Sequence, residues 1–449
     1  MSEGNLRSAI GLRDAVAIEV GLIIGAGLFS LTGVATAIAG PMVFLAYLLS
    51  FAIVILGLIP TAMLGAAFPT TGGNYRYPSR LFSPHVAFLS TWGLAVSMFV
   101  GGLPLYALSF GEYVADLVPV DPTLVAVIAL SVFWLANVAG IDIAARLQTV
   151  MFLSLVASLL LFIGFGLPAI EPANLGGFFT KGPTGLLTGA AVLYFVCLGA
   201  NFVVDIGGEL VTATTTIPRS FAVSVPLVMV LYVFTALVGV GTVGWTALAG
   251  QTLSVPARAF LSPTLATLFI VGGALFAIAT TINAVFIIAP KYLLVLAADN
   301  VFPSLVARVN DRFGTPHWGL TVIYLVSIAA VLSPLPFDQL GSMLGFGGIF
   351  LIVPVMIGAI RFAREHPASY ADAPFSPRKS VLYASAIGAV VLNTLLFAML
   401  GWQSSGVFAI WLGLLGLGVA YYGVRRWRLA RRGVEMPDVS GPVAEALDD

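Results

Sequence analysis

Long apolar stretches separated by short polar segments dominate this chain. A run of about 20 apolar residues is long enough to cross the hydrocarbon core of a bilayer as a helix, and the sequence accommodates twelve such runs. The predicted spans are residues 15–38, 41–67, 86–117, 122–140, 147–169, 186–210, 221–247, 264–297, 317–333, 339–360, 380–401 and 406–424. The pattern therefore predicts an all-α membrane protein with twelve transmembrane helices.

Glycines interrupt the first predicted span. Gly21, Gly25 and Gly27 fall within seven residues of an otherwise apolar segment. A glycine costs a helix interior roughly 1 kcal/mol relative to alanine, and a helix that unwinds in lipid must line a cavity or be covered by protein. Its free amides and carbonyls then form a site for an anion beside a cation, and an α-amino acid carries both charges. The alternative is a small-residue packing face of the GxxxG kind.

The sixth span resembles the first at this interruption. Residues 198–202 read Leu-Gly-Ala-Asn-Phe and residues 24–28 read Ile-Gly-Ala-Gly-Leu. Because the two runs lie five spans apart, their helices enter the membrane from opposite sides. Interrupted spans at matching positions of two halves are typical of an inverted repeat with a binding site near the membrane midplane.

Composition supports a membrane protein and excludes several kinds of site. The chain is 59% hydrophobic and 9% charged, with mean hydropathy +1.04, which no soluble domain of 449 residues approaches. The single cysteine, Cys197, excludes an intrachain disulfide and a thiolate metal cluster, and the three histidines have no ligand spacing. No cofactor is expected. Residues 1–14 lack the features of a signal peptide, so the first span is expected to direct its own insertion.

Basic residues predict the orientation. With the N-terminus inside, only Lys181 and Arg258 of the 20 Lys and Arg fall on outer segments. Positive residues favour the cytoplasmic side, so both termini are predicted to be cytoplasmic. The cluster Arg425–Arg432 then faces membrane lipid, and the segment from 433 to 449 is polar. We expect no nucleic-acid partner.

Four motifs resemble the amino acid–polyamine–organocation superfamily of transporters. They are the glycine-rich first span, the run Pro69–Tyr77 after span two, the run Glu209–Arg219 after span six, and residues from Asn283 through Lys291, Asp299 and Pro303 to Arg312–Pro316. Together they extend over most of spans one to nine. Spans eleven and twelve carry no such motif.

The resemblance implies a LeuT-like fold, a five-plus-five inverted repeat with discontinuous helices 1 and 6 and two extra helices. Repeat one would cover residues 9–170, repeat two 186–361, the extra helices 380–424 and a cytoplasmic tail 425–449. It implies a secondary active transporter of amino acids in the cytoplasmic membrane that works by alternating access.

The sequence departs from the family pattern at three places. The paired acid and Lys-Asn-Pro after span six are replaced by Glu209-Leu210 and residues 212–214. The Gly-aromatic-acid run at the span-six break reads Ala-Asn-Phe at 200–202. No lysine lies in residues 153–156, where some members carry one in place of a sodium ion. The last departure argues against a lysine-dependent proton mechanism.

The resemblance places the substrate at the two breaks. The carboxylate would take the amides of Gly25, Ala26 and Gly27, and the ammonium would take carbonyls around Ile23, Leu198 and Gly199. The side chain of the substrate would be recognised by residues that are mostly apolar, which favours a neutral substrate. The candidates are Ile24, Met98, Gly101, Phe195, Ala200, Asn201, Phe202, Val285 and Phe346, and either Phe195 or Phe202 would form an aromatic lid.

Three acids inside predicted spans are candidates for proton coupling. Glu19 lies in the inner half of span one, and Asp205 and Glu209 lie in the inner half of span six. Intramembrane acids are costly and therefore suggest function. The alternative is a fixed hydrogen bond or an ion pair with a base such as Arg80 or Arg219, which we favour for Glu209.

Sodium is the other candidate coupling ion. The hydroxyls of Thr280 and Thr281, with carbonyls of Gly21 and Ile24, would supply oxygen ligands. The alternative is that each threonine bonds a preceding carbonyl of its own helix.

Other functions fit the sequence less well. A channel would need a selectivity-filter repeat or a charged ring, and an enzyme would need a nucleophile–base pair or a metal cluster. The sequence shows neither pattern. Cationic amino acids or polyamines remain alternative substrates, with Glu19 or Asp205 as counter-charge. A sensor that binds without transporting is a further alternative.

Overall fold

The computed structural model describes residues 10–115, 117–310 and 312–433. Within these ranges the chain is helical, and its β-type pairings are two isolated bridges, Ile10 with Leu210 and Thr71 with Ile206. Eight helices among the described residues are long and apolar enough to cross a membrane, and two more apolar helices are shorter. The fold is therefore that of an all-helical, multi-pass membrane protein.

The first half of the chain contains eight α-helices. They are α1 (Leu12–Ile23), α2 (Ala26–Ala39), α3 (Val43–Ala67), α4 (Gly73–Leu81), α5 (Pro84–Val96), α6 (Leu103–Ala115), α7 (Pro122–Val138) and α8 (Ile141–Gly166). A π-helical turn, η3 (Ser97–Gly102), joins α5 to α6.

The second half begins with a short helix and two 3₁₀ turns. These are α9 (Gly182–Cys197), η6 (Ala200–Asp205) and η7 (Gly207–Glu209). They are followed by α10 (Ala213–Val243), α11 (Trp245–Leu248), α12 (Ser254–Phe260), α13 (Pro263–Phe269), the π turn η8 (Ile270–Leu275), α14 (Phe276–Ala298), α15 (His317–Val331), α16 (Phe337–Glu365), α17 (Pro367–Asp372), α18 (Lys379–Gln403) and α19 (Ser405–Ala430).

Several predicted boundaries differ from those of the helices, and three of the differences have a clear physical reason. Span seven was expected to begin at residue 221, but α10 begins at Ala213. Span five was expected from residue 147, but α8 begins at Ile141. In both cases the polar first turns lower the hydropathy without ending the helix. Span six was drawn as one run to residue 210, whereas α9 ends at Cys197.

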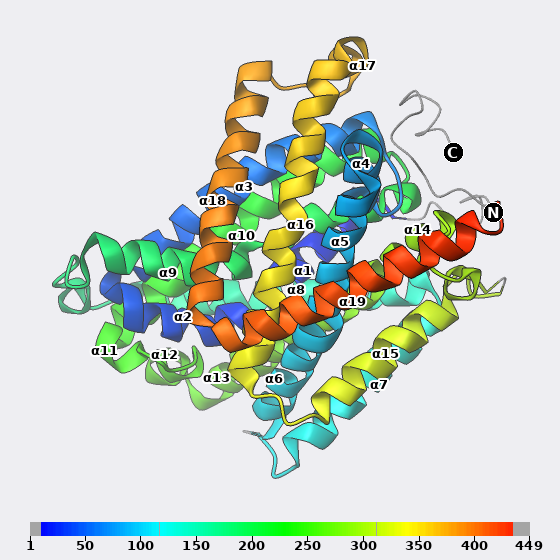
Figure 1. The fold of residues 1–449 in the computed structure, drawn as a ribbon. Coiled ribbons are helices and arrows are strands. Elements are labelled where there is room, and N and C mark those ends of the chain that lie inside the picture. The colour runs from blue at the N-terminus through cyan, green and yellow to red at the C-terminus, as the bar shows by residue number, and fades with distance from the viewer. Residues whose placement is uncertain (1–9, 116, 311, 434–449) are drawn as a thin grey trace.

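The helices form a bundle in which α1 and α14 are largely buried, while α8 is buried along one face only. Figure 1 shows α2 beside α9 on one side and α7 beside α15 on another, and both pairs are in contact. Helix α16 runs next to α18 along much of its length, and α19 crosses α5 and α16. The junction between α1 and α2, at Ile24 and Gly25, lies inside the bundle, where Ile24 is fully buried.

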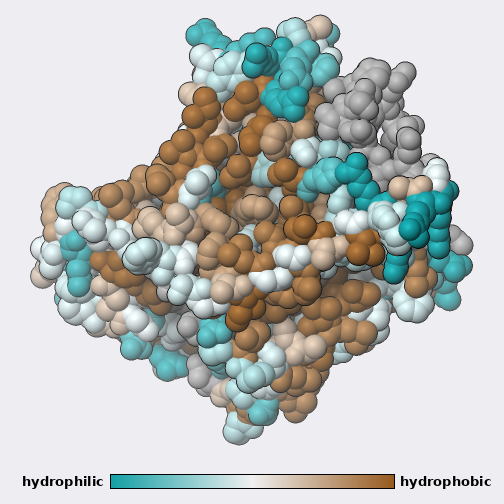
Figure 2. Space-filling model, in the orientation of Figure 1, coloured by the Kyte–Doolittle hydropathy of each residue, from teal (hydrophilic) through white to brown (hydrophobic). Residues whose placement is uncertain are grey.

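An apolar surface covers one face of the bundle. Figure 2 shows hydrophobic residues over α16, α18 and the middle of α19, with polar residues gathered at α17 and at the C-terminal end of α19. Exposed side chains such as Ile387, Val391 and Leu395 on α18 contribute to it. A broad apolar face between polar ends is what a bilayer requires of a protein that spans it.

Candidate functional site

The first break separates α1 from α2. Helix α1 ends at Ile23, and Ile24 and Gly25 are extended before α2 begins at Ala26. No side chain caps α2, and the first amides of any helix have no acceptor within it. The start of α2 therefore presents N–H donors and the positive end of a helix dipole. In one detail the structure differs from the sequence prediction, because the Gly25 amide donates to the Ile23 carbonyl at 3.1 Å.

The second break directly contacts the first. Helix α9 ends at Cys197, Leu198 and Gly199 are non-helical, and Gly199 has φ +143°. A Cβ on Gly199 would lie 2.8 Å from the carbonyl carbon of Leu22 and 2.9 Å from the amide nitrogen of Ile23. Only glycine allows this approach, since it has no Cβ and tolerates a positive φ.

Tyr232 holds the two breaks together and was not predicted from the sequence. Its hydroxyl, on α10, donates to the Ile23 carbonyl at 2.7 Å and lies 3.4 Å from the Val196 carbonyl. Tyr47 packs edge-on against its ring and is hydrogen-bonded to Thr32 on α2. This buried phenol therefore fixes the carbonyl end of α1 beside that of α9.

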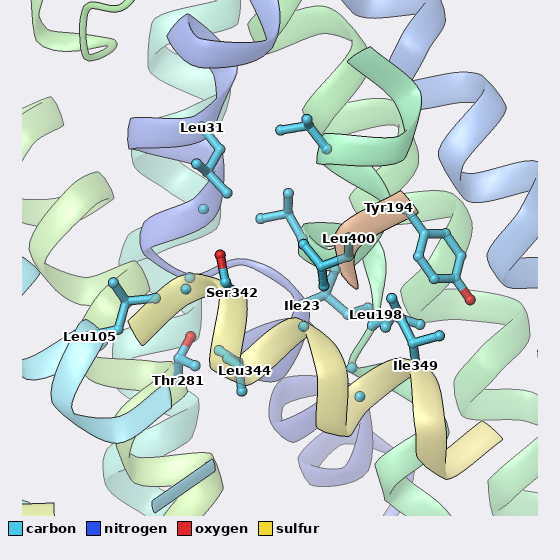
Figure 3. A pocket seen from close by; sticks show the side chains of 18 of the residues that line it. Ile23, Leu31, Leu105, Tyr194, Leu198, Thr281, Ser342, Leu344, Ile349 and Leu400 are labelled. Atoms are coloured by element: carbon cyan, nitrogen blue, oxygen red, sulfur yellow. The ribbon is translucent and has the colours of Figure 1, made fainter. Parts of the chain in front are cut away.

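A cavity of about 450 Å³ lies at the breaks. Figure 3 shows side chains from α2, α6, α14, α16 and α18 around it. The residues that line it are Leu22, Ile23, Gly25, Gly27, Leu31, Val34, Leu94, Met98, Leu105, Tyr106, Ser109, Thr188, Ala191, Val192, Tyr194, Val196, Leu198, Gly199, Asn201, Phe202, Thr281, Val285, Gly341, Ser342, Leu344, Gly345, Gly348, Ile349, Leu396, Met399 and Leu400. Among the described residues of this lining there is no acidic, basic or histidine side chain.

Most predicted substrate residues line the cavity. From the two breaks these are Ile23, Gly25, Gly27, Leu198, Gly199, Asn201 and Phe202, and Met98 and Val285 join them. Ile24 and Ala200 are buried outside the lining. The side chains of Ala26 and of Phe195, one of the two lid candidates, lie outside the described residues.

Two further selectivity candidates do not reach the cavity. Phe346 is fully buried on the other side of α16, where its ring packs against Phe397, Phe408 and Trp411. Gly101 lies against the backbone of α16, since a Cβ there would be 2.8 Å from the Leu340 carbonyl oxygen. A helix that is apolar all round gives no indication of which face meets a cavity.

Helix α18 supplies one wall of the cavity, although its sequence carries no motif. Leu396, Met399 and Leu400 belong to the lining. Leu400 also packs on α16, where a Cβ at Gly345 would meet its Cδ2 at 2.8 Å. Asn393 on α18 accepts a hydrogen bond from Tyr194 on α9 at 2.7 Å. Helix α18 thus contributes to the cavity at the breaks.

The three intramembrane acids are buried, and each has different partners. Glu19 accepts hydrogen bonds from Ser220 and Ser224 on α10. Asp205 accepts from the backbone amide and the side-chain amide of Asn74 and from the hydroxyl of Tyr292. Neither carboxylate has a salt bridge among the described residues.

Glu209 forms an ion pair, but not with the bases expected. Its partner is Lys291 on α14, and Arg80 instead pairs with Asp299 at 2.8 Å. Arg219 is exposed. Glu209 thus forms the fixed ion pair that the sequence favours, with Lys291 and not with either of the two bases given as examples, because the fold brings together residues 82 positions apart.

The candidate sodium ligands are partly assembled. The Thr281 hydroxyl donates to the Gly21 carbonyl at 2.6 Å and lies 3.4 Å from the Ile24 carbonyl oxygen. The Thr280 hydroxyl donates instead to Ala277 of its own helix. Three of the four groups therefore meet at the first break.

Comparison with known proteins identifies the family. The family model described as amino acid permease matches residues 10–420. The chain belongs to the amino acid permease family. An uncharacterized transporter of Mycobacterium tuberculosis is 28% identical to this permease over 430 residues, which cover 94% of the permease and 92% of the relative.

Two other relatives are transporters with named substrates. The branched-chain amino acid permease BcaP of Bacillus subtilis is 23% identical, covering 94% of this permease and 93% of BcaP. The mitochondrial cationic amino acid transporter 3 of Arabidopsis thaliana is 26% identical, over an alignment that covers 80% of this permease and 63% of the relative. Family and relatives indicate a multi-pass membrane transporter of amino acids rather than an enzyme.

Proposed function

We propose that this permease carries neutral amino acids with apolar side chains across the cell membrane by alternating access, with both termini in the cytoplasm. The observation that carries the proposal is an uncharged cavity built on two touching helix breaks. The lining contains bare peptide groups for the charged ends of an amino acid and apolar side chains for the rest of it.

The peptide groups suit a zwitterion. The uncapped start of α2 offers amides for the carboxylate, and the ends of α1 and α9 offer carbonyls for the ammonium. Glycines at 25 and 199 allow the ligand to approach the backbone. These are the positions proposed from the sequence, with the refinement that the amides of Ala26 and Gly27 are better placed than that of Gly25.

The lining argues for a neutral side chain. A charged side chain held at membrane depth without a partner costs roughly 2.5–3.5 kcal/mol, which corresponds to about 100-fold in affinity. The acids closest to the breaks in the sequence are Glu19 and Asp205. Glu19 is hydrogen-bonded to Ser220 and Ser224, Asp205 to Asn74 and Tyr292, and neither is among the residues that line the cavity. The name of BcaP supports the same substrate class.

The architecture we propose is twelve spans with a five-plus-five inverted repeat (9–170 and 186–361), followed by the extra helices 380–424. One new observation supports the repeat. The third span of each half contains a π-helical turn with a glycine pair, Gly101-Gly102 in η3 and Gly272-Gly273 in η8. Matching irregularities of this kind are expected if the two halves share one fold.

The cavity lies on one side of the breaks, which supports alternating access. Its walls extend along α2 and α9 to Val34 and Thr188. On the opposite side, Ile10 forms a parallel bridge with Leu210, in which the Ile10 amide donates to the Glu209 carbonyl at 3.0 Å and the Val211 amide donates to the Ile10 carbonyl at 3.1 Å. Lys291 pairs with Glu209 on the same side. With the N-terminus in the cytoplasm, this is an outward-open carrier closed on its inner side.

Uptake by the purified permease in sealed proteoliposomes tests the function. We expect leucine, isoleucine, valine, methionine and phenylalanine to be taken up, and arginine, lysine and putrescine to compete about 100-fold more weakly. Sodium and pH gradients imposed separately assign the coupling ion, including the candidate sodium site at Thr281. Binding without uptake would indicate a sensor. Preferred uptake of arginine or putrescine would overturn the proposal that the substrate is a neutral amino acid.

Shortening a side chain of the α18 wall should change substrate size preference. Leu400→Ala removes three carbons from the lining, so we expect kcat/KM for phenylalanine to rise several-fold relative to valine. The measurement is competitive uptake of the two amino acids. Leu395→Ala is the matched control, because Leu395 is on the same helix, 55% exposed and outside the lining. Equal size preference in the two variants would show that α18 does not contact the substrate.

A further inference from the structure

We propose that Glu19 is the proton-binding group that couples transport to a proton gradient, with Ser220 and Ser224 as its partners; the inference rests on the proposed transport function. Three acids are buried within the membrane region, and their hydrogen-bond partners differ in one chemical respect. Among the partners that the described residues supply, those of Glu19 alone are all hydroxyl groups, which can donate to a carboxylate and accept from a carboxylic acid.

The partners of Glu209 and Asp205 suit a permanent negative charge. Lys291 has donors only, and it pairs with Glu209. Asp205 receives two N–H donors from Asn74, at 2.9 and 2.7 Å. The side-chain amide of Asn74 also donates to the Asn201 carbonyl at 3.0 Å, which fixes its orientation. A proton on either acid would leave a buried donor unpaired, which costs about 1–3 kcal/mol.

The serines can satisfy Glu19 in both states. With the carboxylate ionised, Ser220 and Ser224 donate to its two oxygens. When a proton binds, the new O–H donates to Ser220, whose own hydrogen turns to the Ile217 carbonyl, 2.9 Å away. The step is a bare proton transfer, from carboxylate plus H⁺ to carboxylic acid, and it leaves no buried polar atom of this group unpaired.

No ionic partner competes for Glu19 among the described side chains around it. Helix α1 packs against α8, α10, α14 and η6. Lys291 and Tyr292 of α14 bond Glu209 and Asp205, Asp205 of η6 bonds Asn74, and Tyr232 of α10 bonds Ile23.

The remaining charged side chains that are described on these helices also face elsewhere. Arg146 of α8 and Arg219 of α10 are exposed. On α1 itself Arg13 is exposed and Asp14 accepts from Thr149 at 3.3 Å. An ionised Glu19 is therefore a buried and uncompensated charge, which a proton neutralises.

Helices α1 and α10 connect Glu19 to the substrate site. It lies four residues, about 6 Å along the helix, before Ile23, whose carbonyl is one of the proposed ammonium acceptors. The same helix α10 contacts both positions, through Ser220 and Ser224 at Glu19 and through Tyr232 at Ile23. A change in charge at Glu19 alters the contact between α1 and α10, and thereby the geometry of the first break.

The test compares two transport modes in proteoliposomes for the wild type and Glu19→Gln. We expect the wild type to accumulate leucine about ten-fold when the outside is one pH unit more acidic, and to respond to an inside-negative potential, since each cycle would carry one positive charge. Glu19→Gln should exchange internal for external leucine at a rate near that of the wild type. It should not accumulate leucine in response to either gradient.

Each outcome decides the matter. A wild type that exchanges leucine but ignores the pH gradient overturns the proton assignment and leaves the transport function standing; a wild type that transports nothing overturns the function itself. Accumulation by Glu19→Gln equal to that of the wild type overturns the role of Glu19. If Glu19→Gln transports in neither mode, leucine binding in detergent is measured as a function of pH. The pH dependence of binding should disappear in Glu19→Gln, and a pH dependence equal to that of the wild type would overturn the proposal. Asp205→Asn is the control and should reduce both modes together.

Discussion

Replacing Gly25 with leucine is expected to abolish substrate binding and transport while the permease still inserts and folds. Gly25 lines the cavity at the first break, and a Cβ there would lie 2.7 Å from the Thr281 hydroxyl oxygen. The rest of the leucine side chain would have to enter the cavity, at the place where the amino acid backbone is proposed to bind. Binding of radiolabelled leucine in detergent and uptake in proteoliposomes measure the effect.

The matched control is Gly164→Leu. Gly164 lies on α8 at an exposed position, and a Cβ there meets nothing within 4 Å. The same side chain is added to a membrane helix but away from the site, so we expect transport near that of the wild type. Intact leucine uptake by Gly25→Leu would show that the substrate does not bind at the first break.

The breaks could be predicted from the sequence because they depend on glycine. Glycines in the middle of an apolar span weaken a helix wherever they fall, and the interruptions lie within one or two residues of the positions inferred, at Ile24–Gly25 and Leu198–Gly199. The resemblance placed both breaks at one substrate, which implied that they lie close together. The observed reason is local, since Gly199 lies directly on the backbone of Leu22 and Ile23.

The walls of the cavity could not be predicted in the same way. Leu396 and Leu400 face the cavity and Leu395 is exposed on the outer surface, yet all three are leucines of one apolar helix. In a bilayer the lipid-facing side is as apolar as the interior, so hydropathy does not separate them. Phe346 was misplaced for this reason, and Tyr232 was overlooked because its function depends on contacts between distant segments.

Breaking the ion pair between Lys291 and Glu209 is expected to open the inner side of the permease. Both side chains are nearly fully buried, and the other carboxylate oxygen of Glu209, Oε2, has no hydrogen-bond partner among the described residues. Lys291→Met therefore leaves a buried charge uncompensated, at a cost of roughly 3–5 kcal/mol. We expect a lower melting temperature in detergent and a population shift of more than 100-fold away from the inner-closed state.

The double variant Lys291→Met/Glu209→Gln tests whether the effect of Lys291→Met comes from the uncompensated charge of Glu209 or from the altered shape of the side chain at position 291. Removing both charges should recover most of the stability lost in Lys291→Met, because a buried pair contributes little more than an apolar replacement. Access is measured by maleimide modification of a cysteine placed at Val204, which is fully buried on η6, in a Cys197→Ala background. Modification should be fast in Lys291→Met and slow in the double variant. Slow modification in Lys291→Met would mean that other contacts, such as the pairing of Ile10 with Leu210, keep the inner side closed without this ion pair.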